Sequence, residues 1–280
     1  TAIIVYRYIP TSPNNFNIIS VGDELLNGHT LNTNLHILCK SIENIGGFVS
    51  RAYIVKDDFA EISFALNNSI SDDSFWIIFS GGLGPTYDDI TIEAISKSLD
   101  LPLKINNDAL AMVKAYYDKL LKTKIISNYN LTTARKKMAL FPIDGIPLKN
   151  NIGTAPGMLL STSNKKIICL PGVPVEMQDI LNCEVVPLIK SKIIKKFKKE
   201  IIVPLHGFTE SDISPILKLL NSKYPDVYIK SHPKGFNEGI SEIQLVISSV
   251  TNSLSNSSDR VHEVLNLWNE MIKKNYAVAN

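Results

Sequence analysis

The chain has 280 residues, 45% hydrophobic and 20% charged, which is typical of a globular protein with a well-buried core, and no apolar run approaches the roughly 20 residues of a membrane-spanning helix. The 29 basic and 27 acidic residues nearly cancel to a net charge of +2, which does not indicate a nucleic-acid binder. Three separate cysteines, Cys39, Cys169 and Cys183, form no CxxC pair, so they argue against structural zinc or a disulfide framework and fit a reducing, cytoplasmic setting.

Residues 1–15 are interpreted as an N-terminal extension, with a candidate edge strand at 3–9 and a loop at 10–15. Regular elements follow it. We predict strands at 17–21, 48–55, 75–79 and 166–170, and helices with one apolar face at about 33–45, 58–70, 90–99 and 173–192. Asp58 with Glu61 is typical of a capping box, and it predicts a helix that turns Phe59, Ile62, Leu66 and Ile70 inward.

The four strands are apolar without alternation, and helices separate them. This pattern predicts a parallel sheet covered on both faces, and therefore an α/β, three-layer domain over residues 16–194.

The stretch 190–199 holds six lysines and is interpreted as a solvated helix end and linker. Beyond it we predict strands at 201–205, 227–230 and 243–248 and helices at 211–220 and 259–273. This order is a small α+β domain, β-α-β-β-α, over residues 195–280. It resembles a KH module superficially, but the GxxG clamp that such modules use on RNA is missing, so nucleic acid is not an expected partner.

The glycine loop 80–89 carries the strongest functional signal, because it lies directly after a buried strand and before a helix. Ligands bind at that edge of an open parallel sheet, and closely spaced glycines let the backbone approach an anion. The loop is neither a Walker A motif nor a dinucleotide fingerprint. A tight turn is the alternative. We expect a phosphate site with ligand contacts from Ser80, Gly81, Gly82, Gly84 and Thr86.

Two carboxylates, Asp88 and Asp89, follow the glycines, and either one could be a helix N-cap. Beside a phosphate site they would repel the ligand unless a cation bridged them. We therefore expect a divalent metal ion, Mg²⁺ or similar, on Asp88 and Asp89, with a monovalent cation as a further candidate. Asp57 also follows a parallel strand, and it is the freer carboxylate of its pair because Asp58 is best explained as a cap.

Other side chains are weaker candidates. Arg135 could grip a phosphate bidentately, although a solvated helix face is equally consistent with its sequence context. Glu24 and Asn34 follow the first strand and could contact base, ribose or metal, with helix capping as the alternative. Pro171 and Gly172 complete the predicted substrate-binding residues.

Several motifs then occur in order: Ile18–Gly28 with Asn32–Asn34, Ser80–Thr91, Thr133–Met138, Asn151–Gly157 and Leu170–Met177, followed by Gly207 and Tyr228–Pro233. Together they resemble the CinA family, in a form similar to its archaeal members, over about residues 16–250. The resemblance implies a fold of the molybdopterin-binding type and a metal-assisted nucleotide site with ADP-ribose pyrophosphatase activity, in which Asp57 and Asp89 match two acidic positions of molybdopterin-binding relatives. Many members also carry a C-terminal amidase domain, for which a chain ending at Asn280 has no room.

We therefore expect a metal-dependent hydrolase of ADP-ribose or a similar nucleotide, with Asp57, Asp89 and Arg135 as catalytic residues and the glycine loop around the pyrophosphate. The alternative is a binding protein for molybdopterin or a related pterin, linked to molybdenum cofactor biosynthesis and without turnover, because one scaffold can host both functions. A small nucleotide is the expected ligand. A membrane is not an expected partner, and we expect a homo-oligomer, a dimer.

Overall fold

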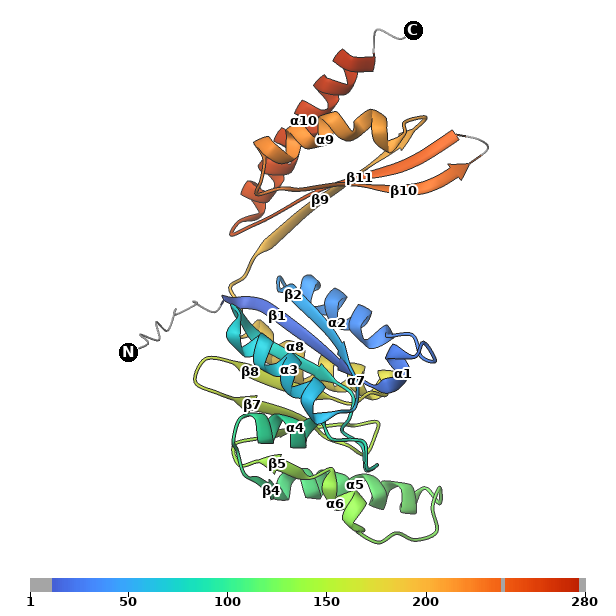
Figure 1. Ribbon diagram of the computed structural model, residues 1–280, viewed down its shortest axis with the longest axis vertical. Coiled ribbons are helices and arrows are strands. Elements are labelled where there is room, and N and C mark those ends of the chain that lie inside the picture. Colours follow the sequence, from blue (N-terminus) through green and yellow to red (C-terminus); the bar gives the residue numbers. More distant parts are fainter. Residues whose placement is uncertain (1–11, 238–239, 277–280) are drawn as a thin grey trace. The chain divides into compact units, whose positions relative to one another are not determined.

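The computed structural model describes residues 12–237 and 240–276, and the chain divides into two compact units between Ile194 and Lys195 (Figure 1). The candidate strand at 3–9 lies outside the described residues. No helix in the described ranges is long and apolar enough to cross a membrane.

A six-stranded sheet in the order β2-β1-β3-β8-β7-β6 forms the centre of the first unit. Four strands are parallel: β1 (Ser12–Val21), β2 (Phe48–Val55), β3 (Ser74–Ser80) and β8 (Lys166–Leu170). Two short strands, β7 (Gly157–Ser161) and β6 (Ile146–Leu148), are added antiparallel at one edge. The predicted α/β fold with a mostly parallel sheet is confirmed.

The first strand is longer than predicted, because it begins at Ser12 and not after a loop at 10–15. Ser12 pairs with Ser74, and Asn15 pairs with Phe48. Polar residues are tolerated in this part of the strand because their side chains have partners. The Asn14 amide donates to the carbonyls of Gly46 and Ile194, at 2.8 Å each.

Helices cover both faces of the sheet, which gives three layers. Neighbouring residues on a strand point to opposite faces, so Ile18 belongs to one core and Ile19 to the other. The core on the Ile18 face also contains residues of α2 (Thr33–Asn44) and α7 (Pro174–Ile180). The core on the Ile19 face contains residues of α3 (Phe59–Ser71) and α4 (Thr91–Ser98).

The last helix of this unit is not the single helix predicted at 173–192. After α7 it continues as a π-helical turn, η1 (Leu181–Val185), and then as α8 (Val186–Lys190). Pro187 has no backbone N–H to donate to the carbonyl four residues earlier, which explains why the regular α-helical hydrogen bonding is interrupted here. Phe59 was also predicted wrongly. It is exposed on α3, with the Lys97 ammonium 5.3 Å from its ring centroid.

Residues 99–142 contain elements that apolar periodicity did not reveal. The strands β4 (Leu103–Ile105) and β5 (Leu140–Pro142) pair with each other, and α5 (Asn107–Lys122) and α6 (Thr133–Lys137) lie between them in the chain. α5 buries only Ala109 and Val113, so its apolar stripe is too narrow to stand out. The four-residue helix α1 (Asp23–Leu26) follows β1.

A buried lysine joins two elements of the first unit. Lys165 is 1% exposed, and its ammonium donates to the carbonyls of Ser69, Asp72 and Ser74. The Asp72 carboxylate is 3.7 Å from the same nitrogen. Burial lowers the pKa of Lys165, and the nearby Asp72 opposes this change by favouring the charged form. These contacts connect the residue before β8 to the end of α3 and the start of β3.

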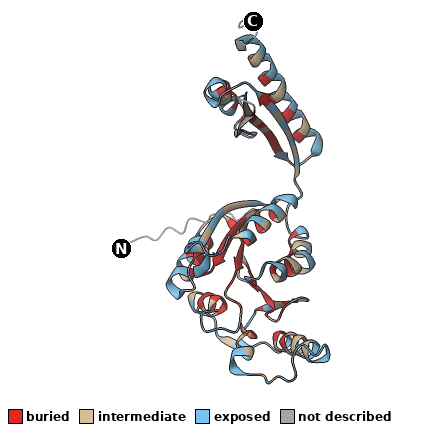
Figure 2. Cartoon of the chain, turned by 90° about the vertical axis from the view of Figure 1, so that its right-hand side faces the viewer, coloured by how far each residue is buried: buried red, intermediate tan, exposed pale blue. Residues whose placement is uncertain are grey.

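The second unit has the predicted β-α-β-β-α order: β9 (Phe197–His206), α9 (Glu210–Lys223), β10 (Tyr228–Asn237), β11 (Ile240–Thr251) and α10 (Leu254–Tyr276). The sheet is antiparallel in the order β10-β11-β9, and its core includes Ile213, Leu245 and Trp268. Figure 2 shows the buried residues of each unit in red. The linker is shorter than the predicted stretch 190–199, because Lys198 and Lys199 belong to β9.

Candidate functional site

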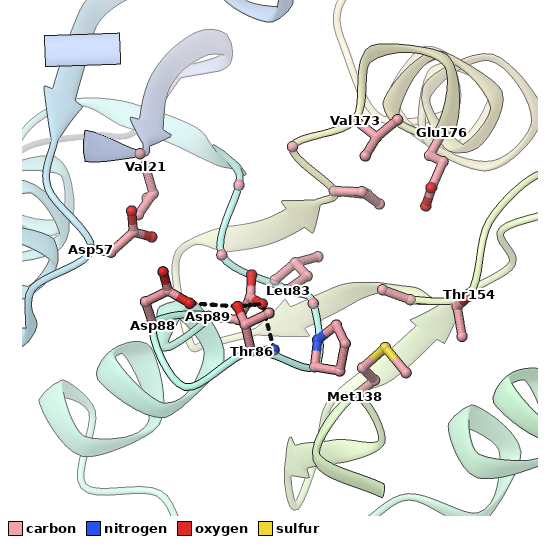
Figure 3. Close-up of a pocket in the computed structure, with 18 of the residues that line it drawn as sticks. Val21, Asp57, Leu83, Thr86, Asp88, Asp89, Met138, Thr154, Val173 and Glu176 are labelled. Atoms are coloured by element: carbon pink, nitrogen blue, oxygen red, sulfur yellow. Dashed lines mark hydrogen bonds between the residues drawn. The ribbon is translucent and has the colours of Figure 1, made fainter. Parts of the chain in front are cut away.

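A pocket of about 390 Å³ lies at the carboxyl ends of β1, β3 and β8. Figure 3 shows the acidic residues Asp57, Asp88 and Asp89 on one side and Val173, Glu176 and Thr154 on the other. The lining comes from six segments of the chain: Val21 with Gly22 and Glu24, Asp57, the glycine loop Gly81–Thr86 with Asp88 and Asp89, Met138, Thr154 with Ala155, and Pro171–Val173 with Glu176.

The backbone of the glycine loop requires glycine at two positions. Gly81 has φ +114° and Gly82 has φ +68°, in the region that side chains disfavour. A Cβ on Gly81 would lie 2.1 Å from the Val21 carbonyl oxygen, and one on Gly82 would lie 2.2 Å from the Thr91 hydroxyl. The Thr91 hydroxyl donates to the Gly81 carbonyl at 2.9 Å and fixes this turn against α4.

Three successive backbone N–H groups of the loop are available to a ligand. Within the described residues, Gly82, Leu83 and Gly84 donate no hydrogen bond from the backbone nitrogen, and all three line the pocket. In contrast, Gly81 N donates to the Leu170 carbonyl and Thr86 N to the Asp89 carboxylate. Consecutive N–H groups of this kind form a concave binding site for an anion. Gly81 therefore shapes the loop, while Gly82 and Gly84 can contact the ligand.

Asp88 and Asp89 both contact Thr86. Asp89 Oδ2 accepts hydrogen bonds from Thr86 N at 2.8 Å and from the Thr86 hydroxyl at 2.5 Å, and Asp88 also accepts from this hydroxyl. The hydroxyl lowers the pKa of Asp88. The N-cap of α4 is Ile90, so neither aspartate caps the helix. The aspartates thus close the 86–89 turn and place two carboxylates at the pocket.

Asp57 lies beside further carboxylates. Burial is the largest cause of the raised pKa of Asp57, and the negative charges of Glu24, Asp23 and Asp88 raise it further. A hydrogen bond that the Asp57 carboxylate accepts from Asp23 N at 3.2 Å lowers the pKa in part. Asp58 accepts from Ala60 N and Glu61 N and caps α3, as predicted. Glu24 lines the pocket, and its carboxylate lies against Gly22. The structure therefore gathers Glu24, Asp57, Asp88 and Asp89 around one pocket.

The carboxylates do not form a complete metal cage. Across the described ranges, no three His, Cys, Asp or Glu side chains converge closely enough to hold an ion by themselves. Carboxylates in this arrangement fit a cation whose coordination is completed by a ligand's phosphate oxygens, as is usual for Mg²⁺. The observation in favour of such a cation is the gathering of Glu24, Asp57, Asp88 and Asp89 around one pocket.

Two predicted ligand contacts, Ser80 and Asn34, hold the loops that line the pocket and do not line it themselves. The Asn34 amide donates to the Ser80 hydroxyl at 2.9 Å and to the Gly172 carbonyl at 2.8 Å. The Ser80 hydroxyl donates to the Pro171 carbonyl at 3.3 Å. Asn34 therefore connects α2 to the loops after β3 and β8. Pro171 and Gly172 do line the pocket.

Arg135 is not where a phosphate-binding role requires it. Its guanidinium carbon lies 4.0 Å from the Tyr117 ring centroid, and Nη1 donates to the Asn130 carbonyl at 2.7 Å. Lys137 takes the position near the loop instead, where its ammonium donates to the Thr86 carbonyl at 2.8 Å and lies 3.9 Å from Glu93. Both residues belong to one basic run, and the run does not show which of them reaches the loop.

The opposite wall of the pocket was not predicted as part of the site. Thr154, Ala155 and Glu176 line it together with the apolar side chains of Met138 and Val173. A signal was present, because all of these residues except Met138 belong to the motifs Asn151–Gly157 and Leu170–Met177. Their position on the chain alone, however, does not show that the loop after β6 meets the start of α7.

A family model described as a probable molybdopterin binding domain matches residues 17–191. A protein of Pyrobaculum arsenaticum is 38% identical over 256 residues, covering 91% of this chain and 94% of that one. Protein PF0476 of Pyrococcus furiosus is 41% identical over 225 residues, or 80% and 86%. The crystal structure of the protein CinA with unknown function from Thermoplasma acidophilum aligns with a TM-score of 0.57 at 38% identity, over 62% of this chain and 98% of that one.

The fold and the pocket thus define an α/β protein with a glycine loop lining a pocket at the edge of its sheet. The chain belongs to the molybdopterin-binding domain family. The predicted resemblance to CinA is confirmed.

Proposed function

We propose that the pocket binds a phosphorylated pterin of the molybdopterin class together with a divalent cation. One observation carries the proposal: the N–H groups of Gly82, Leu83 and Gly84 have no partner in the described chain and line a pocket that also holds several carboxylates. The N–H groups suit a phosphate, and the description of the family supports a pterin as the rest of the ligand.

The charge of the pocket supports the cation. Among the residues that line it, all of them described, none is Lys, Arg or His, whereas Glu24, Asp57, Asp88, Asp89 and Glu176 are acidic. An anionic ligand next to these groups would be repelled, by about 1–4 kcal/mol for each pair of unit charges at 4 Å in effective dielectrics of 80 to 20. Asp57, Asp88 and Asp89 would hold the cation. When bound, it would neutralise this charge and polarise the phosphate.

The residues of the chain have separate roles in this proposal. The glycine loop binds the phosphate, and Thr91 keeps the loop in its left-handed conformation through the Gly81 carbonyl. Lys137 holds the turn that carries both aspartates through the Thr86 carbonyl. Asn34 maintains the spacing between the loops after β3 and β8.

The carboxylates also favour a second candidate, the metal-dependent hydrolysis of ADP-ribose or a related dinucleotide. A cation held by these carboxylates would not only neutralise the bound phosphate but could also position an attacking water, as in metal-dependent hydrolases. Asp57 and Asp89 would serve this step. Arg135 takes no part in this step, because its guanidinium packs on Tyr117.

Calorimetric titration of the purified protein separates the two candidates. A phosphorylated pterin and ADP-ribose are each titrated with and without Mg²⁺, and AMP release from ADP-ribose is followed by chromatography. We expect pterin binding that requires Mg²⁺ and is lost in Asp88→Asn combined with Asp89→Asn. Turnover of ADP-ribose to AMP and ribose 5-phosphate would support the second candidate. Binding of neither ligand, with or without the cation, would refute both.

The predicted homo-oligomer stays a prediction, which light scattering of the purified protein tests directly.

A further inference from the structure

We infer that Glu176 selects the heterocycle of the ligand, and that it favours a ring with two adjacent N–H donors, as in pterin and guanine, over adenine. The inference rests on the proposed function and assigns the second half of the same pocket. Glu176 is the only acidic residue among the described residues of the wall opposite the glycine loop, and Figure 3 shows it beside the apolar Val173, across the pocket from Asp57, Asp88 and Asp89.

The position of this carboxylate is fixed by a network from the loop after β6. Asn150 Nδ2 donates to Glu176 Oε2 at 2.7 Å and to the Ala155 carbonyl at 2.9 Å. Asn150 Oδ1 accepts from Ile152 N and from Gly153 N, at 3.1 and 2.7 Å. The Asn150 side chain is thereby held in one orientation, and it holds the carboxylate in turn.

Gly153 makes room for the carboxylate. A Cβ at this position would lie 1.9 Å from both Cδ and Oε2 of Glu176, a separation that no side chain tolerates. The carboxylate therefore packs flat against the Gly153 backbone at the edge of the pocket. Within the described residues, Oε1 accepts no hydrogen bond, and Oε2 has accepted one of the two that an ionised oxygen can take.

Two oxygens with free acceptor capacity match a particular ligand edge. Pterin and guanine present a ring N–H and an exocyclic amino group side by side, and a carboxylate can accept from both, as it does from a guanidinium. Adenine presents an amino group beside a ring nitrogen with a lone pair, which would face a negatively charged oxygen. The carboxylate would be left without a second donor and would face a lone pair, which opposes binding, so the site should discriminate between the two ring types.

A neighbouring carboxylate provides a matched control. Asp179 is also on α7 and also holds the loop after β6, because its Oδ2 accepts from Asn151 N at 2.8 Å and from Asn151 Nδ2 at 3.0 Å. It does not line the pocket. If Glu176 acted only by holding this loop, replacing Asp179 should have the same effect on ligand preference as replacing Glu176. If Glu176 contacts the ligand, only its own replacement should change the preference.

The test measures the affinity of the full chain, in Mg²⁺, for GMP, IMP, AMP, dihydroneopterin phosphate and inorganic pyrophosphate. We expect GMP and the pterin to bind about tenfold or more tightly than AMP, with IMP between them because it lacks the amino group. Glu176→Gln should remove this preference without weakening pyrophosphate binding, because it takes one negative charge away from the pocket. Asp179→Asn should keep it. Gly153→Ala, which displaces the carboxylate without removing it, should also lose it.

Three results would overturn the inference. Equal affinity of the natural chain for AMP and GMP, or an equal loss of preference in Glu176→Gln and Asp179→Asn, would refute the role of Glu176 while leaving the phosphate and cation site intact. Failure of pyrophosphate to bind in Mg²⁺ would refute the proposed function itself. A preference for GMP over the pterin would keep Glu176 as the selecting residue and change the ligand to a guanine nucleotide.

Discussion

Asp57→Asn should stabilise the protein when no cation is present. The amide keeps the shape of the side chain and can still accept from Asp23 N, but it removes one negative charge beside Glu24 and Asp88. Because the site is partly exposed, the relief of repulsion is about 0.5–1 kcal/mol at neutral pH. For a domain of this size that corresponds to an increase in Tm of about 1–4 °C.

The pH dependence of this effect has a definite sign. Since the pKa of Asp57 is raised in the folded state, the native protein holds this proton to a higher pH than the unfolded chain does. The contribution of Asp57 to stability is therefore most favourable in acid and decreases as the pH rises above about 4, the ordinary range for an aspartate. The advantage of Asp57→Asn should grow over the same range and disappear below it.

With ligand and Mg²⁺ the order should reverse. A ligand at 100 times its Kd stabilises the natural chain by about 2.7 kcal/mol, and Asp57→Asn should lose most of this gain. Differential scanning fluorimetry with and without EDTA measures both effects. Asp58→Asn is the control, because Asp58 caps α3 outside the pocket and asparagine is an equally good cap. A lower Tm of Asp57→Asn in EDTA, or an equal response of both variants to ligand and Mg²⁺, would refute the reasoning.

Three further predictions concern the frame of the site. Lys165→Met should lower the free energy of unfolding of the first unit, measured in urea, by about 3–5 kcal/mol, because three carbonyls and Asp72 lose a buried partner. A loss below about 1 kcal/mol would contradict the role of Lys165 in joining these elements. Arg135→Ala should lower the free energy of unfolding by about 1 kcal/mol, because it removes the contact with Tyr117, but it should leave ligand affinity unchanged. Lys137→Met should weaken ligand binding, because it removes the contact with the Thr86 carbonyl. Equal ligand affinities of the two variants would contradict these separate roles. Trypsin should cut first at Lys195 or Lys196, which are exposed and precede β9, and mass spectrometry that finds earlier cleavage elsewhere would show that this linker is protected.

The sequence predicted those parts of the fold that depend on strong local patterns. The run Phe75–Phe79 is apolar enough to require burial on both faces, and the glycines after it mark the edge of the sheet where the pocket lies. Asp58 was recognisable as a cap because its type and spacing are sufficient for that role. The helix α5 escaped notice, since it buries only two small side chains.

The site residues that were missed depend on contacts between distant segments. Arg135 and Lys137 lie two residues apart in one basic run, and only the direction of the short helix α6 decides which side chain reaches Thr86. Glu176 meets Gly153 because the loop after β6 converges with the start of α7, and nothing in either segment alone indicates this. Asn34 was expected to contact the ligand, but the loops that it joins use its amide.

A crystal structure of the protein with a phosphorylated pterin and Mn²⁺, collected at the manganese absorption edge, tests the central claim most directly. The account predicts phosphate oxygens within hydrogen-bonding distance of the nitrogens of Gly82, Leu83 and Gly84, and an anomalous peak between that phosphate and the carboxylates of Asp57, Asp88 and Asp89. A phosphate bound away from the glycine loop, or one bound there with no anomalous peak beside these carboxylates, would contradict it.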